Sequence, residues 1–347
     1  MQYRKLGRTG VEVSNQCLGS MMFGAMGNRD HDECVAMVHR ALDAGINFVD
    51  TADVYSLGES EEIVGRALKG RRDDVVLATK CFTPMGDERN HRGGSRRWIV
   101  RAVEDSLRRL DTDHIDLYQV HRHDWTADVD ETLGALSDLV HQGKVLYLGS
   151  SGYPADWIVE AQWVAERRNR ERFVCEQPQY SIFARSVEDA VLPACERHGM
   201  GVIPWSPLAG GWLTGKYRRD QEAPAGSRQV VTAAIRGRTL EEDPATPARY
   251  DVVERLAAVA DEAGLPMAHM ALAFVDAHPV VTAAIIGPRT PEQLEDALAA
   301  ADVTLSADTL DAIDDIVRPG TDVAGIRHMS GNPHGARSRA DLRRRGA

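Results

Sequence analysis

The 347-residue chain has little of several features that would each point to a particular class of protein. Aromatic residues make up 6% of it, and its five cysteines are odd in number, scattered and without a C-x-x-C pair. This spacing argues against a disulfide framework and against the common zinc motifs, and it is typical of a cytoplasmic protein. The most apolar stretch, residues 267–287, is interrupted by two histidines, an aspartate and a proline. We therefore expect no membrane-spanning segment, and the N-terminus shows no secretory signal.

Positive charge is also scarce. The chain has 41 lysines and arginines against 52 aspartates and glutamates, which gives a formal net charge of -11 at pH 7. Such a field repels phosphate backbones and anionic lipid surfaces. Neither nucleic acid nor a membrane is therefore an expected partner.

Short apolar runs alternate along the chain with segments of helical period. Six consecutive runs start at residues 46, 75, 115, 145, 173 and 201, which is the spacing of βα units. One further run lies on each side of these six. The eight predicted strands are Gln16–Leu18, Ile46–Val49, Val75–Thr79, Ile115–Val120, Val145–Leu148, Phe173–Glu176, Gly201–Pro204 and Ala283–Ile286. Eight strands with intervening helices predict a (β/α)8 TIM barrel, and a doubly wound sheet is the alternative on pattern alone.

Five further segments complete the predicted organisation. Residues 3–13 form an N-terminal β-hairpin with a turn at residues 8–10, and residues 217–248 form a long loop between strands 7 and 8. Helices are expected at residues 252–263 and 267–277. We predict a single barrel domain over residues 1–318 and an Arg-rich, solvated C-terminal tail over residues 319–347.

Polar side chains follow the predicted strands at the ends where a barrel forms its active site. Asp50 and Tyr55 follow the second strand, Lys80 ends the third, and His121 and His123 end the fourth. Polar residues also follow the later strands, as in Ser150–Ser151, Gln177, Ser206 and Arg289. The sequence therefore predicts one polar site at this end of the barrel.

Four of these segments resemble the aldo-keto reductase family. They are Gly45-Ile46-Asn47-Phe48-Val49-Asp50-Thr51-Ala52-Asp53-Val54-Tyr55, Leu77-Ala78-Thr79-Lys80, Asp116-Leu117-Tyr118-Gln119-Val120-His121 and residues 287–294. They occur in the family's order along nearly the whole chain. The resemblance implies a catalytic tetrad of Asp50, Tyr55, Lys80 and His121, a small-molecule aldehyde or ketone as substrate, and NADPH as cofactor.

The chemistry explains why these four residue types are needed together. Hydride delivery to a carbonyl carbon leaves an alkoxide that needs a proton, and a phenol with a pKa near 10 donates reluctantly. A cationic Lys80 beside Tyr55 favours the phenolate, and Asp50 holds Lys80 in place. His121 orients and polarises the carbonyl group.

The same resemblance assigns the cofactor contacts. Trp205 stacks on the nicotinamide, whereas Ser151 and Gln177 bind its carboxamide. Ser206, Leu208, Gly210 and Lys216 lie in the segment over the pyrophosphate, and Gly287, Arg289 and Gln293 lie at the 2′-phosphate and adenine. The sequence departs from the family at Gly152 and Ala297, where asparagine is frequent in the family.

Two short motifs are incomplete matches to those of other classes of protein. The segment Gly210 to Lys216 has Walker-like spacing, but Tyr217 stands where such a loop needs Ser or Thr for magnesium. His121 and His123 form a His-x-His pair without further ligands at matching strand ends, so no metal is expected. A cofactor-binding regulatory subunit, similar to the potassium-channel β subunits of the same family, is the alternative to an enzyme. The substrate-pocket rim is expected from Met22, Phe23, Trp125 and residues 217–248.

Overall fold

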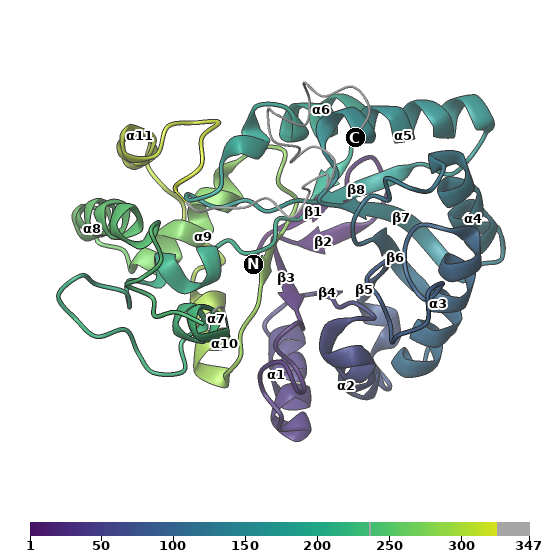
Figure 1. Ribbon diagram of the computed structural model, residues 1–347, viewed down its shortest axis with the longest axis horizontal. Coiled ribbons are helices and arrows are strands. Elements are labelled where there is room, and N and C mark those ends of the chain that lie inside the picture. The colour runs from purple at the N-terminus through teal and green to yellow at the C-terminus, as the bar shows by residue number, and fades with distance from the viewer. Residues whose placement is uncertain (236, 325–347) are drawn as a thin grey trace.

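The computed structural model describes residues 1–235 and 237–324, which form a β-hairpin and an eight-stranded parallel sheet (Figure 1). The spatial order of the sheet is β10-β3-β4-β5-β6-β7-β8-β9. The hairpin pairs β1 (Tyr3–Lys5) with β2 (Glu12–Ser14). The sheet strands are β3 (Gln16–Gly19), β4 (Phe48–Asp50), β5 (Val76–Cys81), β6 (Ile115–Val120), β7 (Val145–Ser151), β8 (Phe173–Gln177), β9 (Gly201–Val202) and β10 (Ala284–Ile286).

Backbone hydrogen bonds join the two ends of this sheet into a barrel. The Thr282 N–H donates to the Val202 carbonyl at 2.8 Å, and the Ile285 N–H donates to the Pro204 carbonyl at 2.9 Å. Closure leaves the sheet without a free edge, so every strand is paired on both sides. The predicted (β/α)8 barrel with an N-terminal hairpin is confirmed.

Helices surround the barrel, and most of them connect consecutive strands (Figure 1). None within the described part of the chain is long and apolar enough to cross a bilayer. The helices are α1 (His31–Asp43), α2 (Glu59–Leu68), α3 (Arg96–Leu110), α4 (Val129–His141), α5 (Ala155–Arg168), α6 (Val191–His198), α7 (Arg228–Ile235), α8 (Thr246–Glu262), α9 (Met267–Ala277), α10 (Pro291–Ala299) and α11 (Ala307–Ile316).

The prediction of one continuous loop over residues 217–248 is wrong in part. Helix α7 lies inside this segment, and α8 begins at Thr246 instead of near residue 252. Gln229 explains why α7 forms, because its backbone N–H donates to the Tyr217 hydroxyl at 3.2 Å and its amide donates to the Gly210 carbonyl at 2.9 Å. These contacts are long-range, so the local composition gave no signal of them.

The end of the described chain packs back on the barrel. The Val323 N–H donates to the Phe183 carbonyl at 2.9 Å, and Asp322 Oδ1 accepts from the Arg185 and Ser186 backbone N–H groups. Most of the predicted Arg-rich tail, from residue 325 on, lies outside the described residues. The domain boundary at residue 319 stays a prediction.

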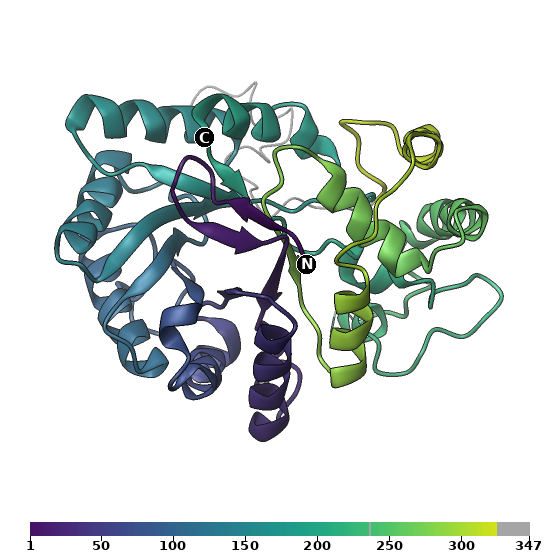
Figure 2. The ribbon, with the colours of Figure 1, turned by 180° about the vertical axis from the view of Figure 1, so that it is seen from behind.

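Apolar side chains form two cores. The larger lies between the sheet and the helices, and a smaller one fills the barrel. Leu6 and Val13 of the hairpin belong to the smaller core together with Phe48 and Leu117. The hairpin therefore closes the N-terminal end of the barrel, as Figure 2 shows, which leaves the opposite end for the polar side chains.

A close approach between α2 and α3 depends on Gly65. A Cβ atom built on Gly65 would lie 2.5 Å from the Leu110 carbonyl oxygen, closer than real Cβ contacts. Because the obstacle is backbone, it cannot rotate away as a side chain can. Helix α2 carries Glu61 into the layer beneath the site, so this packing also fixes the position of that carboxylate.

We predict that Gly65→Ala lowers the free energy of unfolding by about 1–2 kcal/mol, measured by urea denaturation with an unchanged m-value. Overpacking costs about 1–3 kcal/mol, and the better helix propensity of alanine returns up to about 1 kcal/mol. Gly10→Ala is the matched control, because no atom lies within 4 Å of a Cβ built there. Equal stability of Gly65→Ala and the parent would contradict the close packing.

Candidate active site

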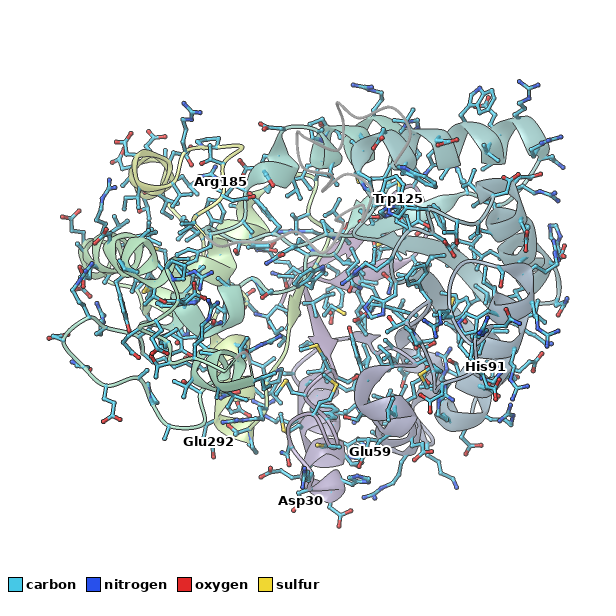
Figure 3. The ribbon with its side chains drawn as sticks, in the orientation of Figure 1. Asp30, Glu59, His91, Trp125, Arg185 and Glu292 are labelled. Carbon is cyan, nitrogen blue, oxygen red and sulfur yellow. The ribbon has the colours of Figure 1, made fainter. Side chains whose placement is uncertain are left out.

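The polar side chains gather where the parallel strands end. Asp30, Glu59 and Glu292 lie at the starts of α1, α2 and α10, the helices that follow β3, β4 and β10. Figure 3 shows these three side chains on the same side of the molecule. Trp125 lies in the loop after β6. The predicted site residues follow the same strands, so the barrel brings them to one face.

A buried ion pair between Lys80 and Asp50 forms the centre of the site. Lys80 has no exposed surface and Asp50 is 2% exposed. Lys80 Nζ lies 2.5 Å from Asp50 Oδ2, donates to the Thr51 carbonyl at 2.8 Å and donates to the Tyr55 hydroxyl at 3.3 Å. All three ammonium donors are therefore used. Burial alone would lower the pKa of Lys80, but the Asp50 carboxylate and the Tyr55 phenol outweigh it and raise that pKa.

Two glutamines complete the hydrogen bonds of Asp50. The side-chain amides of Gln119 and Gln177 donate to Asp50 Oδ1 at 3.0 and 2.9 Å, and the Gln177 amide also lies 3.1 Å from Gln119 Oε1. Gln119 was not among the predicted site residues. Its signal was available, because it lies near the end of β6, two residues before His121, and alternate residues along an extended chain share one face.

Tyr55 starts a strained turn. Ser56 and Leu57 follow it with φ angles of 49° and 55°, and consecutive non-glycine residues in this region cost roughly 1–2 kcal/mol each. The Ser56 hydroxyl holds the turn by donating to the Phe23 carbonyl at 2.9 Å and accepting from the Met26 N–H at 3.1 Å. The turn keeps the Tyr55 hydroxyl next to Lys80. Phe23 is fully buried, so it packs in the core and not at the expected rim.

Burial raises the pKa of Tyr55 above its ordinary value. The positive charge of Lys80 lowers that pKa, as expected from the sequence, but in this structure burial outweighs it. Tyr55 is therefore a protonated phenol at neutral pH, which is the form that donates a proton. Lys80 reduces the cost of the phenolate that remains after donation.

His121 lies beside Tyr55, with the ring centroids 5.8 Å apart and the rings nearly perpendicular. Burial, then the charges of Lys80 and Arg122, holds the pKa of His121 well below its usual range. The imidazole is therefore neutral at pH 7. Its Nδ1 is buried and, among the described residues, has no hydrogen-bond partner.

A second buried carboxylate supports the site from the side of α2. Glu61 has no exposed surface, and it accepts from the Thr79 hydroxyl at 2.6 Å and from Arg109 Nε at 2.6 Å. Thr79 precedes Lys80 in β5. The hydrogen bond of Glu61 to Thr79 and its ion pair with Arg109 therefore connect α2 and α3 to β5, the strand that carries Lys80. No local pattern in the sequence indicates these contacts.

The predicted nicotinamide contacts lie at the ends of β7, β8 and β9. The Ser151 hydroxyl donates to the Gln177 carbonyl at 2.9 Å and accepts from Arg122 Nη1 at 3.3 Å. Trp205 is partly exposed, but its indole N–H is buried without a partner within the described residues. Gly152 has a φ of 62° and no side chain to replace the asparagine that is frequent at this position in the family.

The segment after Trp205 forms a glycine-rich cradle. Ser206, Gly210 and Gly211 have φ angles of 62°, 65° and 97°, and a Cβ on Gly210 would lie 2.5 Å from the Gln229 amide. Leu208 lies in the same turn, and its carbonyl accepts from the Gly211 N–H at 2.8 Å. The absence of a side chain at Gly210 therefore lets the Gln229 amide approach the backbone closely.

Cations surround this cradle. Burial and the nearby charge of Arg289 lower the pKa of Lys216, which shows that the two cations lie close enough to repel each other. Arg289 Nη1 donates to the Gly226 carbonyl at 3.4 Å. Arg228, the first residue of α7, faces the same region, because its side chain passes 3.9 Å from a Cβ built on Gly210. Arg228 was not predicted, since the helix that positions it was not.

The start of α10 provides the remaining predicted contacts. Thr290 caps this helix by accepting from the Gln293 N–H at 3.4 Å, and Pro291 is its first residue, as expected. Gln293 Oε1 accepts from the Arg289 N–H at 2.9 Å, and no atom lies within 4 Å of a Cβ built on Gly287. Exposed N–H groups at a helix start favour an anion. Ala297 is 7% exposed and buried on the inner face of the helix.

The structure gives no support for a metal at His121 and His123. Within residues 1–235 and 237–324, no group of three or more His, Cys, Asp or Glu side chains is arranged to hold a metal ion. His123 instead packs against Trp125, with ring centroids 3.9 Å apart, and against Tyr153 and Trp157. Burial lowers the pKa of His123 to about 4.

Comparisons with known proteins agree with this geometry. The model of the aldo/keto reductase family matches residues 16–318. An uncharacterized oxidoreductase, YrpG of Bacillus subtilis, is 42% identical over 328 residues, which cover 91% of this chain and 96% of YrpG. A probable voltage-gated potassium channel subunit beta of Oryza sativa is 37% identical over 92% of this chain and 97% of its own. The aldo-keto reductase AMT2 of Alternaria alternata is 35% identical over 90% of each chain.

The chain belongs to the aldo/keto reductase family. Membership supports an oxidoreductase activity on small carbonyl compounds.

Proposed function

We propose that the protein reduces an aldehyde or ketone to the corresponding alcohol with NADPH. The observation that carries the proposal is the position of Lys80, which lies between the Asp50 carboxylate and the Tyr55 hydroxyl in a buried site. Tyr55 is the proton donor, and the pair of Lys80 and Asp50 adjusts the pKa of its hydroxyl. A bound NADPH would supply the hydride.

His121 holds the substrate in this account. A neutral imidazole donates from one ring nitrogen only, so it polarises a carbonyl oxygen without taking the proton that Tyr55 delivers. Together Tyr55 and His121 offer two donors for one carbonyl oxygen. The T-shaped contact of the two rings fixes their relative direction.

The chemistry of the surrounding side chains fits NADPH. Lys216, Arg228 and Arg289 suit the phosphates, while Ser206, Leu208 and Gly210 belong to the cradle that lets the pyrophosphate approach the backbone. The partly exposed Trp205 ring suits a stacked nicotinamide, and its indole N–H lacks a protein partner within the described residues. Ser151 and Gln177 would hold the carboxamide. Gly287 leaves open space beside Arg289 and Gln293 for the adenosine.

The alternative is a cofactor-binding regulatory subunit with little turnover. The similarity to proteins named as probable potassium channel β subunits favours it, because fold alone does not separate the two functions. The buried tetrad favours an enzyme. A cytoplasmic location is also proposed, and the five cysteines support it because all are buried as free thiols.

Tyr55→Phe is expected to lower kcat for 4-nitrobenzaldehyde reduction on the order of 10²-fold or more, because it removes the donor hydroxyl and keeps the ring. Binding of NADPH, measured by tryptophan fluorescence quenching, should not weaken. Tyr3→Phe is the matched control, since the Tyr3 hydroxyl donates to the Gly45 carbonyl at 2.7 Å and the residue is 51% exposed. Activity of Tyr55→Phe within about threefold of the parent would remove Tyr55 from its role.

Lys80→Met is expected to lower turnover and to move the alkaline limb of the reduction profile to higher pH. Reduction needs protonated Tyr55, so activity falls as pH rises through the pKa of this phenol. Lys80 lowers that pKa and Asp50 raises it, so losing Lys80 raises it further. The measurement is kcat against pH, with the exposed Lys69→Met as control. An unshifted limb in a folded, measurable variant would show that another group tunes Tyr55.

Arg289→Ala is expected to abolish most of the preference for NADPH over NADH. In the parent we expect at least tenfold tighter binding of NADPH, because each charge-assisted hydrogen bond to the 2′-phosphate contributes roughly 1.5–3 kcal/mol. NADH affinity should stay nearly constant. Titration of both cofactors checks this, and Arg172→Ala, exposed before β8, serves as control. Equal cofactor affinities in the parent would show that Arg289 does not bind the phosphate.

A further inference from the structure

Gln119 connects the reaction centre to the proposed nicotinamide contacts. It lies near the end of β6 and has no exposed surface, so it acts on a bound ligand only through its neighbours. Its side-chain amide donates to Asp50 Oδ1 at 3.0 Å, and its Oε1 accepts from Gln177 Nε2 at 3.1 Å. Gln119 therefore joins the carboxylate of the tetrad to a residue that the proposed function places at the nicotinamide carboxamide.

The negative charge of Asp50 determines which way both glutamine amides face. Asp50 is ion-paired with Lys80, and an ionised carboxylate accepts hydrogen bonds without donating any. An amide that contacts it must therefore present its NH2 group and turn its oxygen away. Gln177 does so, because its Nε2 donates to Asp50 Oδ1 at 2.9 Å.

Gln119 takes up the second hydrogen of the Gln177 amide. A glutamine NH2 group has two hydrogens, and those of Gln177 go to Asp50 Oδ1 and to Gln119 Oε1. A single acceptor would let the amide pivot about that contact, whereas two acceptors hold its orientation. No residue within the described part of the chain donates to Gln177 Oε1. This oxygen is therefore the atom of the Gln177 amide that is left for a ligand, and it accepts hydrogen bonds only.

The neighbouring groups increase the importance of this oxygen. The Ser151 hydroxyl donates to the Gln177 backbone carbonyl at 2.9 Å, so its hydrogen is also used within the protein. Gly152 stands where asparagine is frequent in the family, so it adds no side-chain amide to the site. The carboxamide of nicotinamide carries an NH2 group and a carbonyl oxygen. Its NH2 group is the part that matches Gln177 Oε1.

We propose that Gln119 is a positioning residue for the cofactor, which holds the Gln177 amide with its oxygen toward the nicotinamide carboxamide. The proposal rests on the proposed function, because NADPH gives the carboxamide its place beside Gln177. It makes the NH2 group of the carboxamide a requirement for tight binding. Without the Gln119 oxygen, the Gln177 amide keeps Asp50 as its single acceptor, and this requirement weakens.

The test compares NADPH with its reduced 3-acetylpyridine analogue, in which a methyl group replaces the amide NH2. Calorimetry gives the two dissociation constants for the full chain without substrate, so no hydride transfer occurs. The parent should bind NADPH at least about fivefold more tightly, because the analogue leaves Gln177 Oε1 without a donor. Gln119→Met should reduce this ratio to about twofold or less, since methionine offers no acceptor oxygen. Gln119→Asn, whose shorter side chain does not reach both partners, should also lower it.

Two further variants separate positioning from a general loss of structure. Gln162→Met is the matched control and should leave the ratio unchanged, because Gln162 is a buried glutamine whose amide donates to the Phe173 carbonyl at the start of β8. Gln177→Met removes the accepting oxygen itself, so adding Gln119→Met to it should not change the ratio further. A ratio that stays at the parent value in Gln119→Met, including an equal weakening of both cofactors, would overturn the proposal.

These outcomes are distinct from those of the proposed function, because binding is measured apart from turnover. If the parent does not reduce 4-nitrobenzaldehyde but the binding ratio falls in Gln119→Met, the reductase activity fails and the positioning role stands. If the parent reduces the aldehyde but binds both cofactors equally tightly, the positioning role fails and the reductase activity stands. A parent that binds neither cofactor contradicts both.

Discussion

The buried ion pair between Lys80 and Asp50 is the interaction on which the rest of the site depends. Removing two charges from water costs several kcal/mol per ion, so such a pair persists only when its hydrogen bonds are complete. Here they are. Lys80 donates to three oxygens, and Asp50 accepts from Lys80 and from two glutamine side chains. The partners come from β4, β5, β6, β8 and the turn after β4, so the closed barrel is what assembles them.

The ion pair contacts Tyr55 through Lys80, but other contacts also hold Tyr55 in place. Tyr55 begins a turn with two strained non-glycine residues, and such residues keep this conformation only where the surrounding structure holds them. Hydrogen bonds from Ser56 to the loop after β3 supply part of that constraint. Burial keeps the phenol protonated, and the lysine lowers the cost of losing the proton. These opposing effects suit a group that must both hold a proton and release it.

The features at strand ends could be predicted from the sequence, whereas those that depend on long-range contacts could not. The barrel, the hairpin and the positions of Asp50, Lys80 and His121 followed from strand spacing and from motifs at strand ends, where the chain direction fixes the geometry. Gln119 was readable from strand alternation but was not singled out. Glu61 and α7 were not readable, because their partners Arg109, Tyr217 and Gly210 are distant in sequence. The net pKa of Tyr55 depended on burial, which composition does not show.

The claim that this site performs hydride transfer is tested most directly by isotope transfer with the unmodified protein. NADPH carrying two deuterium atoms at C4 would be incubated with 4-nitrobenzaldehyde and the protein, with cofactor and aldehyde both in large molar excess over the protein, and the product analysed by mass spectrometry. The account predicts many turnovers, with one deuterium on the alcohol carbon for each NADPH oxidised. A bound but unconsumed cofactor, or an alcohol without deuterium, would contradict it and favour the regulatory subunit.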